Sequence, residues 1–186
     1  MELIKTKFPD LQIIKPDIFS DFRGETLSVY NTKLGKQAGV EFREFNIMTS
    51  RKGVLRGINY TPSCWKIYQC LQGMMYYVFV ACDEKDPEFG QWEAVTLTDR
   101  NRLQIIKPPR FGTGFYALTD CAVLWIQDFY YEDKTEQITY KYDDKRFDIY
   151  WPIEYPITSE RHRVGDSSRF LKFERKTGVI NNEKGQ

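Results

Sequence analysis

Short apolar runs dominate the chain between residues 26 and 130. Some of these runs alternate with polar residues and others are continuous, and hardly any stretch has a helical period. They are rich in aromatic and β-branched residues, which favour strands. Turn-forming residues separate them, for example the Gly- and Lys-containing segment 33–39 and Pro108-Pro109. Many short strands at regular spacing predict an all-β sandwich or barrel. We predict strands over residues 26–30, 41–48, 53–60, 65–71, 74–82, 92–98, 103–107, 114–118 and 121–130.

One predicted strand, residues 74–82, is apolar on both faces. This pattern suits a central strand with one face toward a cavity and the other against a second sheet or another subunit. Tyr76 and Tyr77 then point to opposite faces, so one of them lines the barrel interior. Its phenol there either serves as an acid or fills the core.

The pattern changes after residue 131. Residues 131–136 are polar, and an aromatic block follows at residues 147–152. Because so many rings would not stay in water, we expect this block to pack on the barrel. Residues 167–186 are rich in Lys and Glu and predict a partly ordered tail. We expect residues 1–186 to form one domain, with its core at about residues 15–165.

The charge balance argues against two classes of partner. The 27 basic and 26 acidic residues give a net charge of +1, so no large field attracts nucleic acid or an anionic membrane. No apolar run is long enough to span a bilayer, and the first residues lack a signal-peptide core, so we expect a cytoplasmic protein.

The four cysteines lack the spacing of a zinc site and the density of a disulfide scaffold. Three of them lie in apolar, strand-like runs. We interpret them as buried thiols, with metal binding as the alternative: Cys64, Cys70, Cys82 and Cys121.

The stretch from Gly53 to Tyr60 carries one arginine, Arg56, among apolar neighbours, where an unpaired positive charge is costly. A guanidinium there suits a phosphate or a carboxylate, and Asn59 adds a neutral donor and acceptor. Strict alternation sends Arg56 and Asn59 to opposite faces, but a glycine inside a strand often marks a bulge. Gly57 would then let both side chains face one cavity. The alternative is an edge strand with Arg56 in solvent.

Several motifs follow one another in a recognisable order: Asp21-Phe22-Arg23-Gly24, Asn46, residues 53–60, Lys66, Gly73, residues 87–92, residues 108–115, Tyr130-Tyr131 and residues 149–152. This order, over about residues 15–165, resembles the dTDP-4-dehydrorhamnose 3,5-epimerase family. The resemblance implies a cupin-type jelly roll, that is, a double-stranded β-helix with short peripheral helices. It also implies a homodimer that works without metal or cofactor. Family members bind a nucleoside-diphosphate-linked 4-keto sugar inside the barrel and invert C3 and C5.

Four binding residues agree in type with the family pattern. Arg23 and Arg56 match its phosphate-binding arginines, and the first usually reaches across the dimer interface. Asn46 matches an amide that contacts the nucleotide, and Lys66 matches a lysine near the keto oxygen. Asn46 could equally satisfy backbone groups, and Lys66 could extend along an aromatic surface.

The catalytic positions depart from the family pattern. Asn59 replaces the histidine base, and Thr113 replaces a second histidine. Trp125 aligns with the family's tyrosine, which delivers a proton to the opposite face of the sugar. His162 aligns with the acidic residue that contacts the family's base. We still expect Thr113 and Trp125 to line the substrate site, together with Glu44, which replaces a glutamine. Two further positions also differ, a glutamate and an aspartate in the family: Ser28 and Tyr77.

Epimerisation beside a ketone needs a base that removes a carbon-bound proton and an acid that returns one from the opposite side. Asn59 accepts no proton at a useful pKa, and the Trp125 indole does not titrate. His162 is the only histidine in the chain. We hypothesise that the titrating group has moved to His162, with Asn59 orienting its ring and Lys66 stabilising the enolate. The alternative is a surface histidine on a polar loop.

Three functions fit the sequence. The first, which we favour, is a nucleoside-diphosphate-linked 4-keto-sugar epimerase or isomerase, acting at C3, C5 or both in deoxysugar or surface-polysaccharide biosynthesis. The second is an inactive nucleotide-sugar-binding homologue that acts as a partner or regulator. The third is a cupin scaffold with an unrelated role. The four matching residues favour the first two functions over the third.

Overall fold

The computed structural model describes residues 2–31, 39–130 and 137–165. Three segments of the sequence analysis lie outside the described residues: most of the expected separator at 33–39, the polar run 131–136 and the expected tail at 167–186. So does Tyr131 of the Tyr130-Tyr131 motif.

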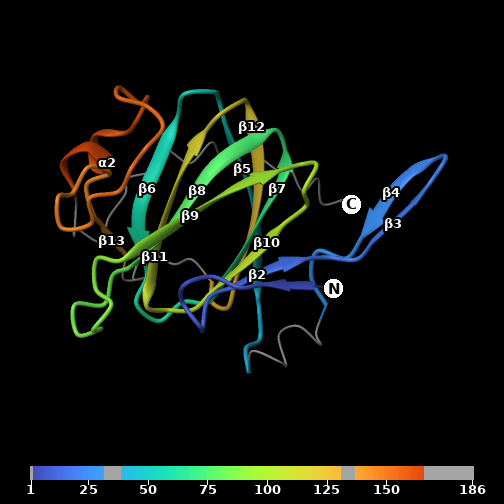
Figure 1. The fold of residues 1–186 in the computed structure, drawn as a ribbon, viewed down its shortest axis with the longest axis horizontal. Helices are drawn as coiled ribbons and strands as arrows, with labels where there is room; N and C mark the ends of the chain where they lie inside the picture. Colours follow the sequence, from blue (N-terminus) through green and yellow to red (C-terminus); the bar gives the residue numbers. More distant parts are fainter. Residues whose placement is uncertain (1, 32–38, 131–136, 166–186) are drawn as a thin grey trace, which may run out of the picture.

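Two antiparallel sheets stack on each other (Figure 1). The six-stranded sheet has the order β1 (Glu2–Ile4), β2 (Gln12–Lys15), β10 (Gln104–Lys107), β7 (Lys66–Gln72), β12 (Cys121–Gln127) and β5 (Glu44–Ser50). The five-stranded sheet has the order β13 (Ile138–Thr139), β6 (Leu55–Tyr60), β11 (Phe111–Ala117), β8 (Met74–Ala81) and β9 (Trp92–Thr98). This arrangement confirms the predicted all-β class.

The main core lies between the two sheets, and the alternation along β8 shows why. Tyr77, Phe79 and Ala81 point into the core, and each is at most 1% exposed. Val78 and Val80 point to the opposite face of the sheet and are equally buried. This confirms that the strand is buried on both faces, which explains its continuous apolar sequence.

The aromatic block near the C-terminus covers the outer face of the five-stranded sheet. Phe147 and Trp151 are buried against Val78 and Val80, and Trp151 Nε1 donates a hydrogen bond to the carbonyl of Tyr142 (2.7 Å). The predicted packing of this block on the barrel is therefore confirmed. The same segment continues into the short helix α2 (Glu160–Val164), which lies beside β6.

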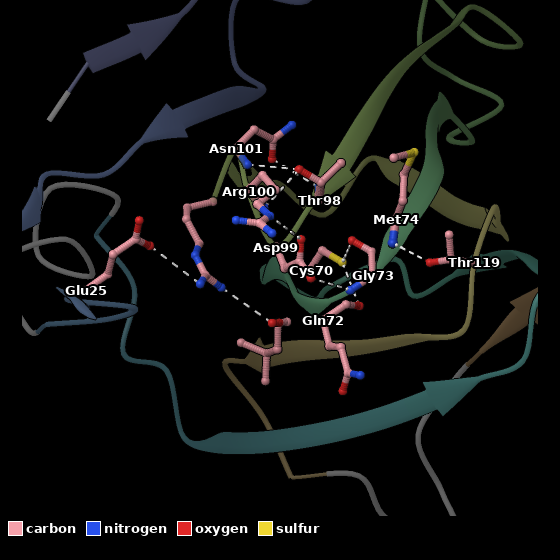
Figure 2. A network of polar contacts seen from close by, with 12 residues as sticks. Glu25, Cys70, Gln72, Gly73, Met74, Thr98, Asp99, Arg100, Asn101 and Thr119 are labelled. Carbon is pink, nitrogen blue, oxygen red and sulfur yellow. Dashed lines mark hydrogen bonds and ion pairs between the residues drawn. The ribbon is translucent and has the colours of Figure 1, made fainter. Parts of the chain in front are cut away.

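A two-stranded hairpin, β3 (Ile18–Asp21) and β4 (Gly24–Leu27), projects away from the barrel (Figure 1). One polar contact connects the hairpin to a turn at one end of the barrel, where further polar contacts join neighbouring turns (Figure 2). Glu25 of β4 forms an ion pair with Arg102 (3.6 Å). Gly73 N donates to Asp99 Oδ2 (2.9 Å), and Asp99 N donates back to the Gly73 carbonyl (3.1 Å). Glu25 pairs with Ser20, next to the turn at the hairpin tip, so this contact attaches β4 to its own barrel near that turn.

Every predicted strand has a counterpart, and most have shifted ends. The strand predicted at 26–30 lies at 24–27, and the one predicted at 114–118 begins already at Phe111. The sequence analysis missed β1, β2, β3 and β13, because strands of two to four residues are too short to show an alternating pattern. Among the described residues, no helix is long and apolar enough to cross a membrane.

The cysteines are buried and unpaired, as predicted. Burial raises the pKa of the Cys64, Cys70 and Cys82 thiols to about 12, so these thiols stay protonated at neutral pH.

Candidate active site

A cavity of about 480 Å³ opens between the two sheets. Its walls come from β5, β7 and β12 of one sheet, from β6, β8 and β11 of the other, and from α2. The volume falls in the range of about 300–1,000 Å³ that small-molecule sites occupy. Eight of the residues expected in the site line it: Glu44, Asn46, Arg56, Asn59, Lys66, Thr113, Trp125 and His162.

A bulge in β6 brings two of these residues to the same cavity. Thr113 of β11 pairs with Asn59, but Phe115, two residues later, pairs with Arg56, so β6 carries one extra residue. Gly57 lies in the bulge with a φ of +130°, a conformation that favours glycine. The predicted bulge is therefore present, and Arg56 and Asn59 both line the cavity.

The Arg56 guanidinium lies at the edge of the cavity. Its Nε donates to Ser50 Oγ (2.9 Å) and its Nη2 donates to the carbonyl of Thr49 (3.2 Å). Burial lowers the pKa of Arg56, but an arginine stays charged at neutral pH. These two bonds engage two of its five N–H groups, so the guanidinium can still bind an anion.

The cavity carries an excess of positive charge. Arg56, Lys66 and Arg161 line it, and among the described lining residues Glu44 is the single acid. Glu44 accepts a hydrogen bond from Gln127 Nε2 (2.6 Å). The Nε of Arg161 is buried and has no hydrogen-bond partner among the described residues. Such a site suits an anionic ligand.

His162, Asn59 and Ser159 form a hydrogen-bonded chain on one side of the cavity. His162 Nε2 lies 3.2 Å from Asn59 Oδ1, and His162 Nδ1 lies 3.0 Å from Ser159 Oγ. Thr139 Oγ1 also donates to Asn59 Oδ1 (3.3 Å). Since an amide oxygen only accepts, Nε2 carries the ring hydrogen in this arrangement and Nδ1 accepts from the Ser159 hydroxyl.

His162 is held in its neutral form. Burial, with the nearby charges of Arg161 and Arg56, lowers its pKa to about 4. A neutral imidazole can accept a proton at pH 7, whereas a protonated one cannot. His162 is therefore a cavity residue capable of acting as a base, rather than a histidine on an exposed loop.

The floor and walls of the cavity provide further polar groups. Trp125 Nε1 donates to Gln127 Oε1 (3.3 Å), which fixes the indole in the wall. Asn46 Nδ2 is buried without a hydrogen-bond partner among the described residues. Tyr68 Oη lies 3.4 Å from Thr113 Oγ1, and the Tyr68 ring packs on Tyr77.

Arg23 is the expected site residue that the structure leaves outside this cavity. It lies at the tip of the β3–β4 hairpin, with its side chain 77% exposed and paired with Asp21 (2.6 Å). Within a single chain, Arg23 and Arg56 therefore do not share a site.

The polar cavity residues that the sequence analysis did not assign to the site include Tyr68, Ser159 and Arg161. Tyr68 follows Lys66 by two positions in a strand, so alternation alone would have placed both on one face. Ser159 and Arg161 gave no such signal, because their position depends on how α2 packs against β6.

The described residues contain no group of three or more His, Cys, Asp or Glu side chains that could hold a metal ion. The cavity combines cations for an anionic ligand, a neutral imidazole, a lysine and two phenols. These groups can bind an anion, accept a proton and donate a proton.

Comparison with known proteins finds similar sequences and structures. A family model described as dTDP-4-dehydrorhamnose 3,5-epimerase matches residues 5–168. A dTDP-4-dehydrorhamnose 3,5-epimerase from Shigella flexneri is 33% identical over 167 residues, covering 87% of this chain and 92% of the relative.

Two solved structures extend the comparison. The first is dTDP-6-deoxy-D-glucose-3,5-epimerase RmlC from Legionella pneumophila Philadelphia 1 in complex with dTDP-4-keto-L-rhamnose, with a TM-score of 0.81, 29% identity, and coverage of 87% of this chain and 89% of that chain. The second is a double mutant of ChmJ, a 3′-monoepimerase from Streptomyces bikiniensis, in complex with dTDP. It has a TM-score of 0.78, 28% identity, and coverage of 85% and 83%. In that mutant, asparagine replaces a histidine and phenylalanine replaces a tyrosine.

Proposed function

We propose, from the premise that this chain belongs to the dTDP-4-dehydrorhamnose 3,5-epimerase family, that it epimerises a nucleoside-diphosphate-linked 4-keto sugar at C3, C5 or both. The family consists of nucleotide-sugar epimerases of deoxysugar biosynthesis. The observation that carries the proposal is the contact between His162 and Asn59, because it places a neutral imidazole at the site although Asn59 itself cannot titrate.

His162 acts as the base in this proposal. Asn59 holds the imidazole as the Nε2–H tautomer, which leaves Nδ1 as the basic atom. The Ser159 hydroxyl on Nδ1 lines the cavity, so a proton taken from the sugar carbon reaches His162 through Ser159. Ser159 Oγ gains the carbon-bound proton as it passes its own proton to Nδ1.

Lys66 stabilises the enolate that remains. Its ammonium lines the same cavity, and a cation near the keto oxygen lowers the energy of the developing negative charge. Arg56 binds the diphosphate, Asn46 contacts the nucleotide with its unpaired amide nitrogen, and Trp125 offers a flat indole for stacking. The complexes of the Legionella and Streptomyces relatives with dTDP-linked sugar and dTDP support this class of ligand.

The working unit in this proposal is a homodimer in which Arg23 binds phosphate in the partner's cavity. Two exposed apolar surfaces support it. Phe45 and Ile47 on the edge strand β5 are 54% and 67% exposed, and Phe19 and Phe22 on the projecting hairpin are 73% and 97% exposed. Burying both surfaces against a second copy would bring the hairpin tip to another chain.

Sedimentation velocity tests the dimer. The wild-type chain should sediment as a dimer, and Ile47→Asp should sediment as a monomer with weaker dTDP binding, because Arg23 then leaves the partner's site. Tyr155→Asp, at a residue that is 83% exposed, is the matched control and should stay dimeric. A monomeric wild-type chain would rule out this arrangement.

An inactive nucleotide-sugar-binding homologue is the second candidate. It is favoured by the lack of a titrating group at Asn59 and Trp125, and by the ChmJ double mutant, which binds dTDP with asparagine in place of a histidine. Both candidates use the same binding residues, so only a measurement of turnover separates them.

Hydrogen exchange in deuterium oxide provides that measurement. With dTDP-4-keto-L-rhamnose, the wild-type chain should exchange the hydrogens beside the ketone for deuterium, as followed by NMR. His162→Gln should slow this exchange by about 10²–10⁴-fold with little loss of dTDP affinity. Arg163→Gln, an exposed neighbour in α2, is the control and should exchange normally. Binding without exchange by the wild-type chain would support the inactive homologue, and absence of dTDP binding would contradict both candidates.

A further inference from the structure

Two phenols, Tyr68 and Tyr77, line the cavity and have no part in the proton removal described above. Tyr68 belongs to β7 and is 9% exposed, and Tyr77 belongs to β8 and is 1% exposed. Their rings pack with centroids 5.1 Å apart, and Tyr68 Oη lies 3.4 Å from Thr113 Oγ1. The three hydroxyl groups thus gather at one place, where the two sheets face each other.

The hydroxyl of Tyr77 is unpaired. Its oxygen is buried and has no hydrogen-bond partner among the described residues. Burial, together with the neighbouring Tyr68 phenol, raises the pKa of Tyr77 well above its ordinary value, so the group stays a neutral donor. An unpaired buried hydroxyl lowers stability, which makes it a poor choice if the ring only fills the core. A role in the reaction would explain why a tyrosine stands at this position.

We propose that Tyr68 is the proton donor of the epimerisation and that Tyr77, as a positioning residue, stabilises the phenolate that Tyr68 becomes. This inference rests on the proposed function. Thr113 supports Tyr68 from the other side through their hydroxyl contact.

The placement of Tyr68 meets the geometric need of an inversion. Inversion requires a base on one face of the sugar and an acid on the other. The Asn59–His162 pair belongs to β6 and α2, beside the five-stranded sheet, whereas Tyr68 comes from the six-stranded sheet. Tyr68 stands directly across from Trp125 on β12, so a phenol adjoins this non-titrating indole.

The chemistry balances without any additional reactant. After the base removes the carbon-bound proton, the enolate carbon takes a proton from Tyr68. The O–H bond of Tyr68 breaks, a C–H bond forms with the electron pair of the enolate, and the ketone is restored. Tyr68 is left as a phenolate, which accepts hydrogen bonds from Tyr77 and Thr113 until it regains a proton from water.

The test separates proton removal from inversion. Removal and return by the base on one face gives deuterium exchange without inversion, whereas inversion also needs the acid. In deuterium oxide with dTDP-4-keto-L-rhamnose, Tyr68→Phe should retain exchange while inversion falls by about 10²–10⁴-fold. Tyr77→Phe should lower inversion by roughly tenfold, because it removes a hydrogen bond to a charged oxygen.

Tyr76→Phe is the matched control, because Tyr76 points to the opposite face and packs on Trp151. It should exchange and invert like the wild-type chain. Thr113→Val, which keeps the shape of the side chain, provides a second variant if Tyr68→Phe does not fold, and it should lower inversion selectively. Binding of dTDP should be unchanged in all of them.

Equal inversion by Tyr68→Phe and the wild-type chain would overturn the donor assignment while leaving the proposed function intact. Equal loss of exchange and inversion in Tyr68→Phe, with normal dTDP binding, would also overturn it. A wild-type chain that binds dTDP but neither exchanges nor inverts would overturn the epimerase function and this inference together.

Discussion

The bulge at Gly57 positions the site, and Gly57→Ala should therefore be among the most damaging small substitutions in this chain. The φ of Gly57 is +130°, and an added Cβ would lie 2.4 Å from Gly114 Cα and 2.9 Å from the carbonyl oxygen of Thr113. Both are backbone atoms of the paired strand β11, so neither can rotate away. Relief requires that β6 and β11 move apart.

Gly24 provides a matched control. Its φ is +133°, nearly the same as that of Gly57, but an added Cβ would meet nothing within 4 Å. Gly24→Ala should therefore cost only the backbone strain, about 1–2 kcal/mol after the smaller entropy of the unfolded chain is counted. Gly57→Ala should cost this amount plus about 2–3 kcal/mol for the overlap with backbone atoms.

The free energy of unfolding of both variants can be measured by urea denaturation. With a slope of about 2 kcal/mol per molar urea, Gly57→Ala should lower the midpoint by roughly 1.5–2.5 M and Gly24→Ala by less than about 1 M. Where Gly57→Ala still folds, dTDP binding should weaken, because Arg56 and Asn59 no longer face the same cavity. Equal midpoints for the two variants would refute the reasoning, because the overlap with β11 would then add no cost to the backbone strain.

Three further predictions concern charged groups. The folded-state pKa of His162, about 4, is below its unfolded value near 6.5, so its contribution to stability is present above pH 6.5 and is lost as the pH falls toward 4. Acid titration of unfolding should show the wild-type chain losing about 2 kcal/mol more than His162→Gln over this range, with allowance for partial exposure. Arg56→Gln should weaken dTDP binding by about 10–100-fold in calorimetry, whereas Arg51→Gln, at an exposed neighbour, should leave it unchanged. Burial lowers the pKa of Lys107 to about 7, so wild-type stability should rise between pH 7 and pH 10.5, and Lys107→Met should abolish this rise while Lys15→Met should not.

The sequence determined much of the fold because strand formation depends on local pattern. Alternating apolar residues and turn-forming residues located nine strands, and the continuous apolar run at 74–82 identified a strand buried on both faces. Gly57 between Arg56 and Asn59 predicted the bulge, since an interior glycine is a local signal of this irregularity.

Only the tertiary structure decided which distant residues meet. His162 contacts Asn59 across 103 positions of sequence, and Tyr68 contacts Thr113 across 45 positions. Local propensity contains no information about either contact, because strand register and the packing of α2 determine both. The resemblance of motifs suggested the first pair, but not that Ser159 completes the chain of hydrogen bonds.

One repeated tetrapeptide shows most clearly what the local sequence leaves to the tertiary structure. Gln-Ile-Ile-Lys occurs at residues 12–15 and again at residues 104–107, and both copies form strands that pair with each other. Lys15 is exposed, whereas Lys107 is 2% exposed and donates a hydrogen bond to the carbonyl of Phe111 (2.9 Å). The sequence analysis predicted a strand over the second copy but not over the first, although both copies form strands. Their neighbours in the sheet decided which lysine is buried, because burial depends on what packs over a residue and not on the residue itself.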